Sequence, residues 1–199
     1  DADSDADTDA DTDVATGDTG GPTDTGPTQP FFVTVQNDSF EAPQLSAASD
    51  WTNGVSGWSG GGVVWLGPGS MFQTSPLAGP ATGNQALFLL DGAQSETGSL
   101  RVVREGWTVH ATVVVAERLD AGLGQSGTSR IELVLDGVVA SFAELPNTTL
   151  RASHGQWNLL ETSFVVDPGQ DGQTLTVRLR STDPTGQVVF DSVAVDITP

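Results

Sequence analysis

The sequence predicts an all-β fold, an antiparallel β-sandwich of the jelly-roll type, preceded by an acidic low-complexity N-terminal tail. Three observations predict it. Short runs of alternating apolar and polar residues, rich in β-branched side chains, are separated by turn-forming residues about every 8–15 positions. No segment shows a convincing helical periodicity. An Asp-Gly pair at 136–137 stands between two alternating runs, which is the pattern of a tight β-hairpin.

The tail occupies residues 1–30 and the sandwich domain residues 31–199. The tail carries nine aspartates and no basic residue, a composition typical of a solvated, self-repelling linker. Seven of these aspartates alternate with small residues, so an extended tail would line them along one edge: Asp1, Asp3, Asp5, Asp7, Asp9, Asp11 and Asp13. Such an edge needs bridging cations or a partner's cationic groups, which makes it a candidate site for assembly or cation binding.

About ten strands are expected in chain order. They are residues 31–35, 55–58, 62–66, 85–91, 100–103, 107–117, the two arms of a hairpin over 131–142, 157–166, 174–180 and 188–197. A Ser-Gly-Gly-Gly turn should separate the second strand from the third. The run at 85–91 is apolar nearly throughout, which indicates a central strand.

Alternation also predicts which side chains face the core. In the strand over 107–117 the inward residues are Trp107, Val109, Ala111, Val113 and Val115, and in the strand over 174–180 they are Leu175, Val177 and Leu179. In the hairpin, the Asp-Gly turn pairs Leu135 with Val138. The inward set then becomes Ile131, Leu133, Leu135, Val138, Ala140 and Phe142.

Charge and composition exclude several classes of function. The formal net charge is −19, with seven Arg and no Lys, so the surface should repel nucleic acid and attract divalent cations. No Cys is present, which excludes disulfides and thiol chemistry. No apolar run reaches the ~18 residues of a transmembrane helix, so membrane insertion is not expected. Asp1 is not an initiator methionine, which is consistent with a mature N-terminus.

The residues suited to catalysis are few. His110 and His154 are the only imidazoles, and neither stands in the spacing of a catalytic triad or a metal site. No nucleophile elbow or phosphate-binding loop is present. A carboxylate pair for glycoside hydrolysis stays open, because such pairs form in space rather than in sequence. The chain is therefore predicted not to be an enzyme.

Aromatic residues are the usual platform for binding a glycan. Trp58 and Trp107 are expected in the core. Trp51, in the polar sequence Asp-Trp-Thr-Asn-Gly, and Trp65, which leads into a Gly/Pro-rich loop, are the candidate exposed rings. These two are the predicted glycan-binding residues.

Four segments carry a resemblance to a known group. They are NDSFEAP at 37–43, VSGWS at 55–59, GNQALFLLDG at 83–92 and, near the C-terminus, LTVRLRST and GQVVFDSVAV within 175–195. In this order and spacing they resemble the galactose-binding-like jelly rolls of secreted bacterial proteins, a group that includes many carbohydrate-binding modules.

The resemblance implies a buried structural Ca²⁺ held by Glu41 and Asp191 with nearby backbone carbonyls. The residue pattern supports this, because Asp191 shares strand parity with Val189 and Val193, and an inward carboxylate needs a partner. Two alternatives remain open: a bulge at Asp191–Ser192 that turns the carboxylate outward, or an arginine partner.

These observations lead to a functional expectation. The chain is expected to be a secreted or cell-surface bacterial module with a structural or adhesive role, which associates with copies of itself through the tail to form a filament or surface assembly. The alternative is a carbohydrate-binding module that is displayed on a flexible acidic stalk and binds a polysaccharide. Fold class alone does not choose between them.

Overall fold

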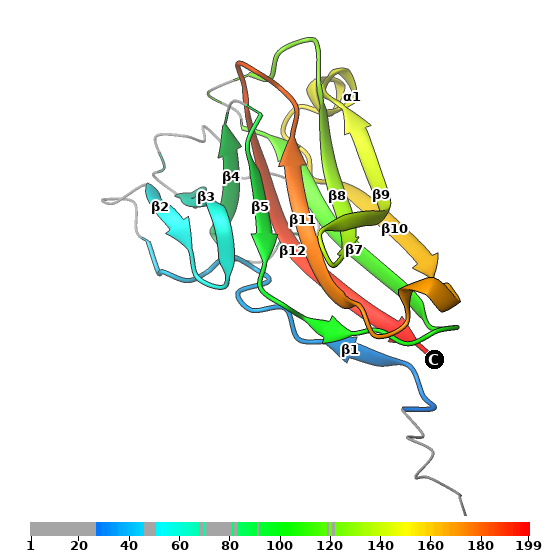
Figure 1. Ribbon diagram of the computed structural model, residues 1–199. Helices are drawn as coiled ribbons and strands as arrows, with labels where there is room; N and C mark the ends of the chain where they lie inside the picture. The colour runs from blue at the N-terminus through cyan, green and yellow to red at the C-terminus, as the bar shows by residue number, and fades with distance from the viewer. Residues whose placement is uncertain are drawn as a thin grey trace, which may run out of the picture.

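Two antiparallel layers of strands face each other across one hydrophobic core (Figure 1). The computed structural model describes residues 27–45, 51–67, 70, 81, 83–90, 92–118, 120 and 122–199. The strands are β1 (Phe31–Val33), β2 (Trp51–Val55), β3 (Trp58–Trp65), β4 (Gln85–Leu90), β5 (Gln94–Thr97), β6 (Arg101–Val102), β7 (Thr108–Glu117), β8 (Thr128–Leu135), β9 (Val138–Pro146), β10 (Asn158–Val165), β11 (Thr174–Ser181) and β12 (Gln187–Thr198). The predicted all-β antiparallel sandwich is confirmed.

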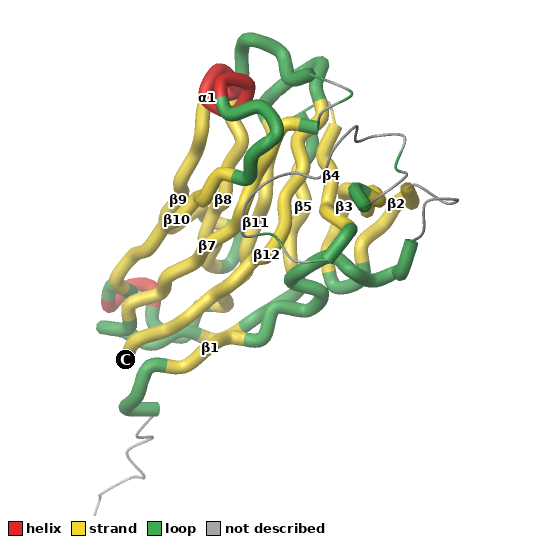
Figure 2. Tube along the Cα trace, turned by 180° about the vertical axis from the view of Figure 1, so that it is seen from behind, coloured by secondary structure: helices red, strands yellow, loops and turns green. Residues whose placement is uncertain are grey.

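The order of strands is β10-β7-β12-β4-β3-β5-β11-β8-β9, with β1 beside β12, β2 beside β3 and β6 beside β11. One layer holds β10, β7, β12, β4 and β3, and the other holds β5, β11, β8 and β9 (Figures 1 and 2). Segments from both ends of the sequence are adjacent, because Phe31 pairs with Ile197. The tail aspartates Asp1 to Asp13 lie outside the described residues.

Strand β3 belongs to both layers because of its glycines. Trp58 and Ser59 pair with β5, whereas Gly62 to Trp65 pair with β4. Between them Gly60 and Gly61 have φ of 83° and 70°, a left-handed conformation that glycine adopts without strain. The predicted Ser-Gly-Gly-Gly turn was therefore wrong. The glycines bend a continuous strand, and the actual turn lies at Ser56–Gly57.

The predicted core faces of β7 and β11 are confirmed. All five predicted inward residues of β7 are buried, and so are Leu175, Val177 and Leu179 in β11. Strand β4 lies between β12 and β3, as its continuous apolar sequence indicated. The inward side chains of both layers form one cluster, so the interior of the sandwich is filled.

The β8–β9 hairpin departs from the prediction in its second arm. Asp136 and Gly137 both have positive φ, as a type I′ turn requires, and Leu135 pairs with Val138. The register then shifts between Leu133 and Val134, because β9 carries one extra residue. As a result Phe142 pairs with Glu132 and is 49% exposed. Val138, beside the turn and before the shift, is 71% exposed, and Ala140 is partly buried against the core. The predicted residues of β8 are buried.

Four short elements were not predicted. They are β2, which precedes the strand expected over 55–58, β5, the helix α1 (Asn147–Ala152) and a 3₁₀ turn at Pro168–Gln170. Each is shorter than the window over which periodicity can be measured. Among the described residues, no helix is long and apolar enough to cross a membrane.

Candidate functional site

A bulge in β12 determines where Asp191 points. Asp191 pairs with Val114, and the next paired residue is Ala194, which pairs with Thr112. Ser192 inside the bulge has φ of 55°. Alternation therefore puts Asp191 on the face of Val189, away from the main core, whereas Val193 and the later apolar residues return to that core. The prediction that Asp191 shares strand parity with Val193 was wrong. The alternative of a bulge at Asp191–Ser192 is confirmed.

We call this side of the sheet the outer face. It is the side of β2, β3, β4, β12, β7 and β10 that points away from the main core. It carries a second apolar cluster consisting of Val64, Leu66, Ala86, Phe88, Ala116 and Val189, with Trp157 packed against it. Strand register places Asp191 directly beside Val114 and, continued by one residue, beside Ala86. Asp191 is 1% exposed, so its carboxyl group is buried.

A pocket of about 230 Å³ opens on the same outer face. Its lining residues are Trp51, Asn53, Val64, Phe88, Leu90, Arg118 and Gln187. The Trp51 and Phe88 rings meet edge to face, with centroids 6.3 Å apart and planes at 80°. Trp51 pairs with Val64, which in turn pairs with Ala86. The pocket wall at Val64 is therefore about 10 Å, or two strand spacings, from Asp191.

One end of the pocket is polar. The Arg118 guanidinium donates through Nη1 to Gln187 Oε1 and through Nη2 to Asp120 Oδ2 at 3.0 Å. Arg118 is largely buried, so these contacts hold a positive charge in place at the rim of the pocket. The site therefore combines an aromatic wall, a fixed cation and a nearby buried acid.

His110 lies on the outer face beyond the bulge. Its Nδ1 is 2.8 Å from Asp196 Oδ2, and its Nε2 is 3.2 Å from Glu161 Oε1. The hydrogen bond with Asp196, assisted by the negative charge of both carboxylates, raises the pKa of His110 above its ordinary value despite partial burial. The other imidazole, His154, lies 2.8 Å from Glu117 Oε2.

Glu41 is the other predicted ligand of the Ca²⁺ site. Its Oε1 accepts hydrogen bonds from the backbone N–H groups of Asn84 at 2.9 Å and Gln85 at 2.8 Å. The Gln85 side chain donates to the carbonyl oxygens of Phe40 and Pro43, both at 2.9 Å. These bonds fasten the Asn-Asp-Ser-Phe-Glu-Ala-Pro segment to the start of β4.

The segment that carries Glu41 also meets the bulge of β12. The backbone N–H of Val193 donates to Asp38 O at 2.9 Å. Within the described part of the chain, no group of three or more His, Asp and Glu side chains is placed to hold a metal. A Ca²⁺ ion held by Glu41 and Asp191 would therefore draw most of its oxygen ligands from backbone carbonyls.

The tryptophans singled out from the sequence differ in burial and in the face of the sheet on which they lie. Trp58 and Trp107 are buried, as expected. Trp51 is 51% exposed and lines the outer-face pocket. Trp65 is only partly exposed and shares strand parity with Val63, which belongs to the main core, so Trp65 does not join Trp51 on the outer face. Sequence reasoning missed Phe88 and Arg118 as site residues. Phe88 was noted only as part of the apolar GNQALFLLDG segment, and Arg118 stands in no motif.

Comparison with known proteins identifies a family. Residues 32–196 match the HpiC1-like family model, which is described as HpiC1 cyclase. Among curated protein sequences, none matches the chain. The family match does not name the galactose-binding-like group that the sequence motifs resemble, and the β-sandwich fold expected from that resemblance is the one observed.

Several solved structures share the fold. A cyclase from Fischerella sp. TAU is 21% identical, with a TM-score of 0.67 over 85% of this chain and 98% of that one. An apo form cyclase from Fischerella sp. is 23% identical, with a TM-score of 0.65 over 87% and 98%. A Fischerella sp. TAU cyclase in complex with 4-(1H-indol-3-yl)butan-2-one is 21% identical, with a TM-score of 0.66 over 85% and 98%.

Proposed function

This chain belongs to the HpiC1-like family, described as HpiC1 cyclase, and we propose that it is an enzyme that closes a ring in a small, largely apolar molecule with Asp191 as the proton donor. The expectation of a non-catalytic structural or adhesive module was wrong, because the matching family is one of cyclases. The same finding contradicts the expected filament role and the alternative of a carbohydrate-binding module on an acidic stalk.

The position of Asp191, buried on the face that also carries the outer-face pocket, carries the proposal. A carboxyl group with Val114, Ala86 and Val189 as neighbours and 1% exposure is shielded from water. A carboxylic acid held away from bulk water can transfer its proton to a bound substrate, which is the role of a general acid. The Ser192 backbone N–H bonds Asp191 Oδ1 at 2.6 Å and fixes the orientation of the group.

Proton transfer from Asp191 would make the substrate cationic, and an internal π-bond would then attack the cation to close the ring. Apolar surroundings protect such a cation from capture by water. Loss of a proton from the ring-closed cation would complete the reaction and return the acid to its starting state. The Trp51 and Phe88 rings offer π-electrons that stabilise a nearby positive charge.

The substrate that we propose carries an indole ring. The pocket is small, at about 230 Å³, and its aromatic pair suits a flat bicyclic group. Support comes from two related cyclase structures, which hold (3Z)-3-(1-methyl-2-pyrrolidinylidene)-3H-indole and 4-(1H-indol-3-yl)butan-2-one. Arg118, held by Asp120 and Gln187, would contact a polar substituent at the rim.

The test is the turnover of indole-bearing alkenes, followed by mass spectrometry, in the wild type and in Asp191→Asn. We expect the substitution to lower the rate by about 10²-fold or more, the range that general acids contribute. Asp196→Asn, on the same strand but beyond the bulge, is the matched control and should react at nearly the wild-type rate. Full activity in Asp191→Asn would contradict the assignment.

A binding measurement tests the role of the pocket independently of the role of the acid. Titration with 4-(1H-indol-3-yl)butan-2-one, followed by tryptophan fluorescence and calorimetry, should give similar affinities for the wild type and Asp191→Asn. Trp51→Ala should bind about tenfold more weakly, because it removes one aromatic wall. If neither Trp51→Ala nor Phe88→Ala alters the affinity, the outer-face pocket is not where the ligand binds.

We also propose that Glu41, rather than Asp191, contributes to a structural Ca²⁺ site, because a carboxylate that binds Ca²⁺ has no proton to donate. The oxygen chemistry of the Glu41 carboxylate supports it, and so does the hydrogen bond between Val193 N–H and Asp38 O, which brings backbone carbonyls of two segments close together. Adding Ca²⁺ after EDTA treatment should raise the melting temperature of the wild type and leave Glu41→Gln unchanged. An identical response in both proteins would remove Glu41 from the site.

We further propose that the protein is secreted or displayed on the cell surface and that it associates with copies of itself. A secreted or cell-surface bacterial location is supported by the resemblance to secreted jelly rolls. Self-association is supported by the exposed Val138 and Phe142 on β9. Sedimentation of the full chain at several concentrations tests the second proposal, and cell fractionation tests the first. Nucleic acid and membrane insertion remain unexpected as partners, given the acidic composition.

A further inference from the structure

Asn53 and Gly54 form the only Asn-Gly pair in the chain. Both residues are exposed and lie in β2. The register of β2 with β3 shifts between Asn53 and Val55, so Gly54 stands outside the paired residues. Gly54 has φ of 84°, and nothing lies within 4 Å of the position that a Cβ would take. The backbone therefore has room to rotate at this pair, and water reaches it.

An asparagine that precedes glycine is chemically labile, because glycine has no side chain to hinder attack by its own backbone nitrogen. The Gly54 nitrogen forms a bond with Asn53 Cγ, the Cγ–Nδ2 bond breaks, and ammonia leaves with the proton of the Gly54 amide. Water then opens the resulting cyclic imide. Attack at Cγ gives aspartate, and attack at the main-chain carbonyl gives isoaspartate. Either product carries a carboxylate in place of the amide, and water is the only reagent consumed.

The other asparagines of the chain are less suited to this reaction. They precede Asp, Gln, Thr and Leu, whose side chains crowd the attacking nitrogen. Asn147 is also buried, and Asn158 Nδ2 donates to Ser153 Oγ at 2.8 Å. By contrast, no hydrogen bond joins the Asn53 side chain to another residue in the described part of the chain. Sequence and surroundings therefore single out Asn53.

Asn53 also lines the outer-face pocket, together with Trp51, Phe88 and Arg118. Its cross-strand partner is Gly62, which pairs on its other side with Phe88. A Cβ at Gly62 would lie 2.6 Å from the Phe88 ring, so the ring lies over this glycine. No β3 side chain therefore separates Asn53 from the aromatic wall, and a charge at position 53 is a charge in the pocket.

We propose that Asn53 is a site of spontaneous deamidation, and that the carboxylate formed there shifts the ligand preference of the outer-face pocket toward cations. Among the described lining residues, Arg118 alone is charged before the reaction. A carboxylate at position 53 attracts an ammonium group and disfavours a neutral ligand that would strip its water. The change in ligand preference rests on the proposed function of the pocket, whereas the modification itself does not.

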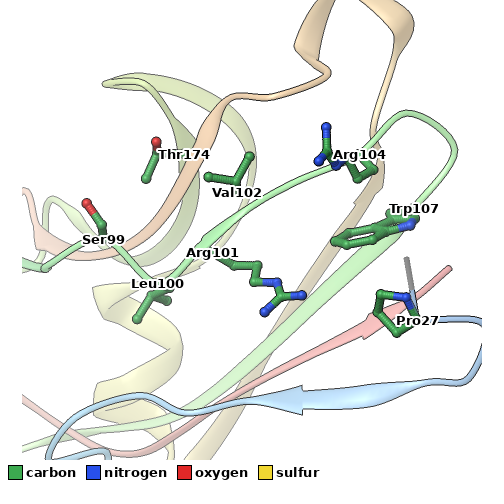
Figure 3. A pocket seen from close by; sticks show the side chains of 8 residues that line it. All are labelled: Pro27, Ser99, Leu100, Arg101, Val102, Arg104, Trp107 and Thr174. Atoms are coloured by element: carbon green, nitrogen blue, oxygen red, sulfur yellow. The ribbon is translucent and has the colours of Figure 1, made fainter. Parts of the chain in front are cut away.

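The change is confined to one pocket. A separate pocket of about 550 Å³ lies where β1 begins, beside Arg101 and Trp107 (Figure 3). The two pockets share none of their described lining residues, and none of those around the larger pocket is an asparagine. Deamidation of Asn53 therefore leaves the charge of the larger pocket as it is.

Peptide mapping of the full chain by mass spectrometry tests the modification. During incubation at mildly alkaline pH, the peptide that contains Asn53 should gain about 1 Da, at least about tenfold faster than the peptide that contains Asn158. Gly54→Ala supplies the missing side chain and should slow the gain at least about fivefold. Gly137→Ala, a matched change at another glycine with positive φ and open space, should leave it unchanged. Equal rates at Asn53 and Asn158 in the wild type would overturn the proposal.

Asn53→Asp reproduces one product and tests the change in ligand preference. The probes are tryptamine, an indole with an ammonium group, and the neutral 4-(1H-indol-3-yl)butan-2-one. The ratio of tryptamine affinity to ketone affinity should rise about threefold in Asn53→Asp. Gln94→Glu, which adds the same charge at an exposed position of β5 in the other layer, is the control and should keep the wild-type ratio.

The Trp51→Ala variant separates the two ways in which this binding test can fail. If Trp51→Ala weakens binding of the ketone but Asn53→Asp leaves the ratio unchanged, the proposed change in ligand preference is wrong. If Trp51→Ala has no effect either, the proposed function of the pocket is wrong. The mass spectra decide the modification of Asn53 in both cases.

Discussion

His110 shows how a single residue on a strand acquires a role from its neighbours. It lies on β7 between Asp196 of β12 and Glu161 of β10, three strands that are adjacent only in the folded sheet. Bonding to these carboxylates favours the imidazolium form, which is why the pKa of His110 is raised from 6.5. The sequence offered no sign of this cluster, because its members lie far apart in the chain.

The first prediction concerns pH. Because the pKa of His110 is higher in the folded protein than in the unfolded chain, its stabilising contribution is fully present below about pH 6.5. The contribution is lost as the pH rises through the folded-state value. The stability difference between the wild type and His110→Gln, measured by urea unfolding from pH 5 to 9, should therefore be largest at low pH. A difference that grows with pH would contradict the assignment.

Gly83 is a second residue whose identity is fixed by its surroundings. It has φ of 73°, and a Cβ built there would lie 2.1 Å from Glu41 Oε1. Glu41 cannot simply move away, because the same oxygen accepts two backbone hydrogen bonds. The glycine therefore permits the close approach that fastens the 37–43 segment to β4.

The second prediction follows from that contact. Gly83→Ala should lower the free energy of unfolding by about 3 kcal/mol, through backbone strain and displacement of Glu41. Gly54→Ala is the matched control, since Gly54 has φ of 84° but nothing within 4 Å of a Cβ. It should lose only the strain, about 1 kcal/mol. Chemical denaturation measures both, and equal losses would show that the Glu41 contact is unimportant.

At the scale of the element, bulges decide which side chains the strands bury. The extra residue in β9 reverses the parity of that strand, so Ala143 and Leu145 pack against the core and Phe142 points outward over Arg130, 4.6 Å from the guanidinium carbon. The bulge in β12 has the same effect on Asp191. Both residues were assigned to the core by simple alternation, which fails across a bulge.

The third prediction compares the two arms of this hairpin. Leu133→Ala in β8 should lower the free energy of unfolding by about 2–5 kcal/mol, because Leu133 is fully buried. Phe142→Ala in β9 should lower it by less than about 1 kcal/mol, since half of the ring is exposed and the contact with Arg130 is at the surface. Thermal or urea unfolding decides it. A large loss of unfolding free energy for Phe142→Ala would contradict the bulged register and support the register without a bulge.

At the scale of the whole molecule, net charge opposes the compact state. The chain carries −19 overall, and its arginines are too few to offset the carboxylates. Repulsion between like charges is relieved on unfolding, because the charges move apart. Closure of the sandwich by β1 and β12 holds the two ends together against it.

The fourth prediction is that salt stabilises the protein. Raising NaCl from about 10 mM to 0.2 M shortens the Debye length from about 30 Å to below 10 Å and screens this repulsion. The melting temperature should rise by several degrees. An uncharged solute of equal osmolality is the control and should have a smaller effect. A melting temperature that falls with added salt would show that specific ion pairs outweigh the net charge.

The sequence by itself determined the fold class, most strand positions and the buried faces of β7 and β11. These depend on alternation and turn chemistry, which are local properties of the chain. It also singled out Trp51 and Asp191, although for binding a glycan and calcium rather than for the active site proposed above. Their predicted roles came from motifs, and motifs do not report what lies on neighbouring strands.

Only the tertiary structure decided which residues share a site. Asp191, Trp51 and Phe88 come from three strands, and strand order with register places them on one face. The bulges in β9 and β12 reversed the faces of Phe142 and Asp191, and a one-residue insertion of this kind leaves no mark on local composition. The physical reason is that pairing between strands is non-local, so a single sequence fixes each strand more firmly than its partners.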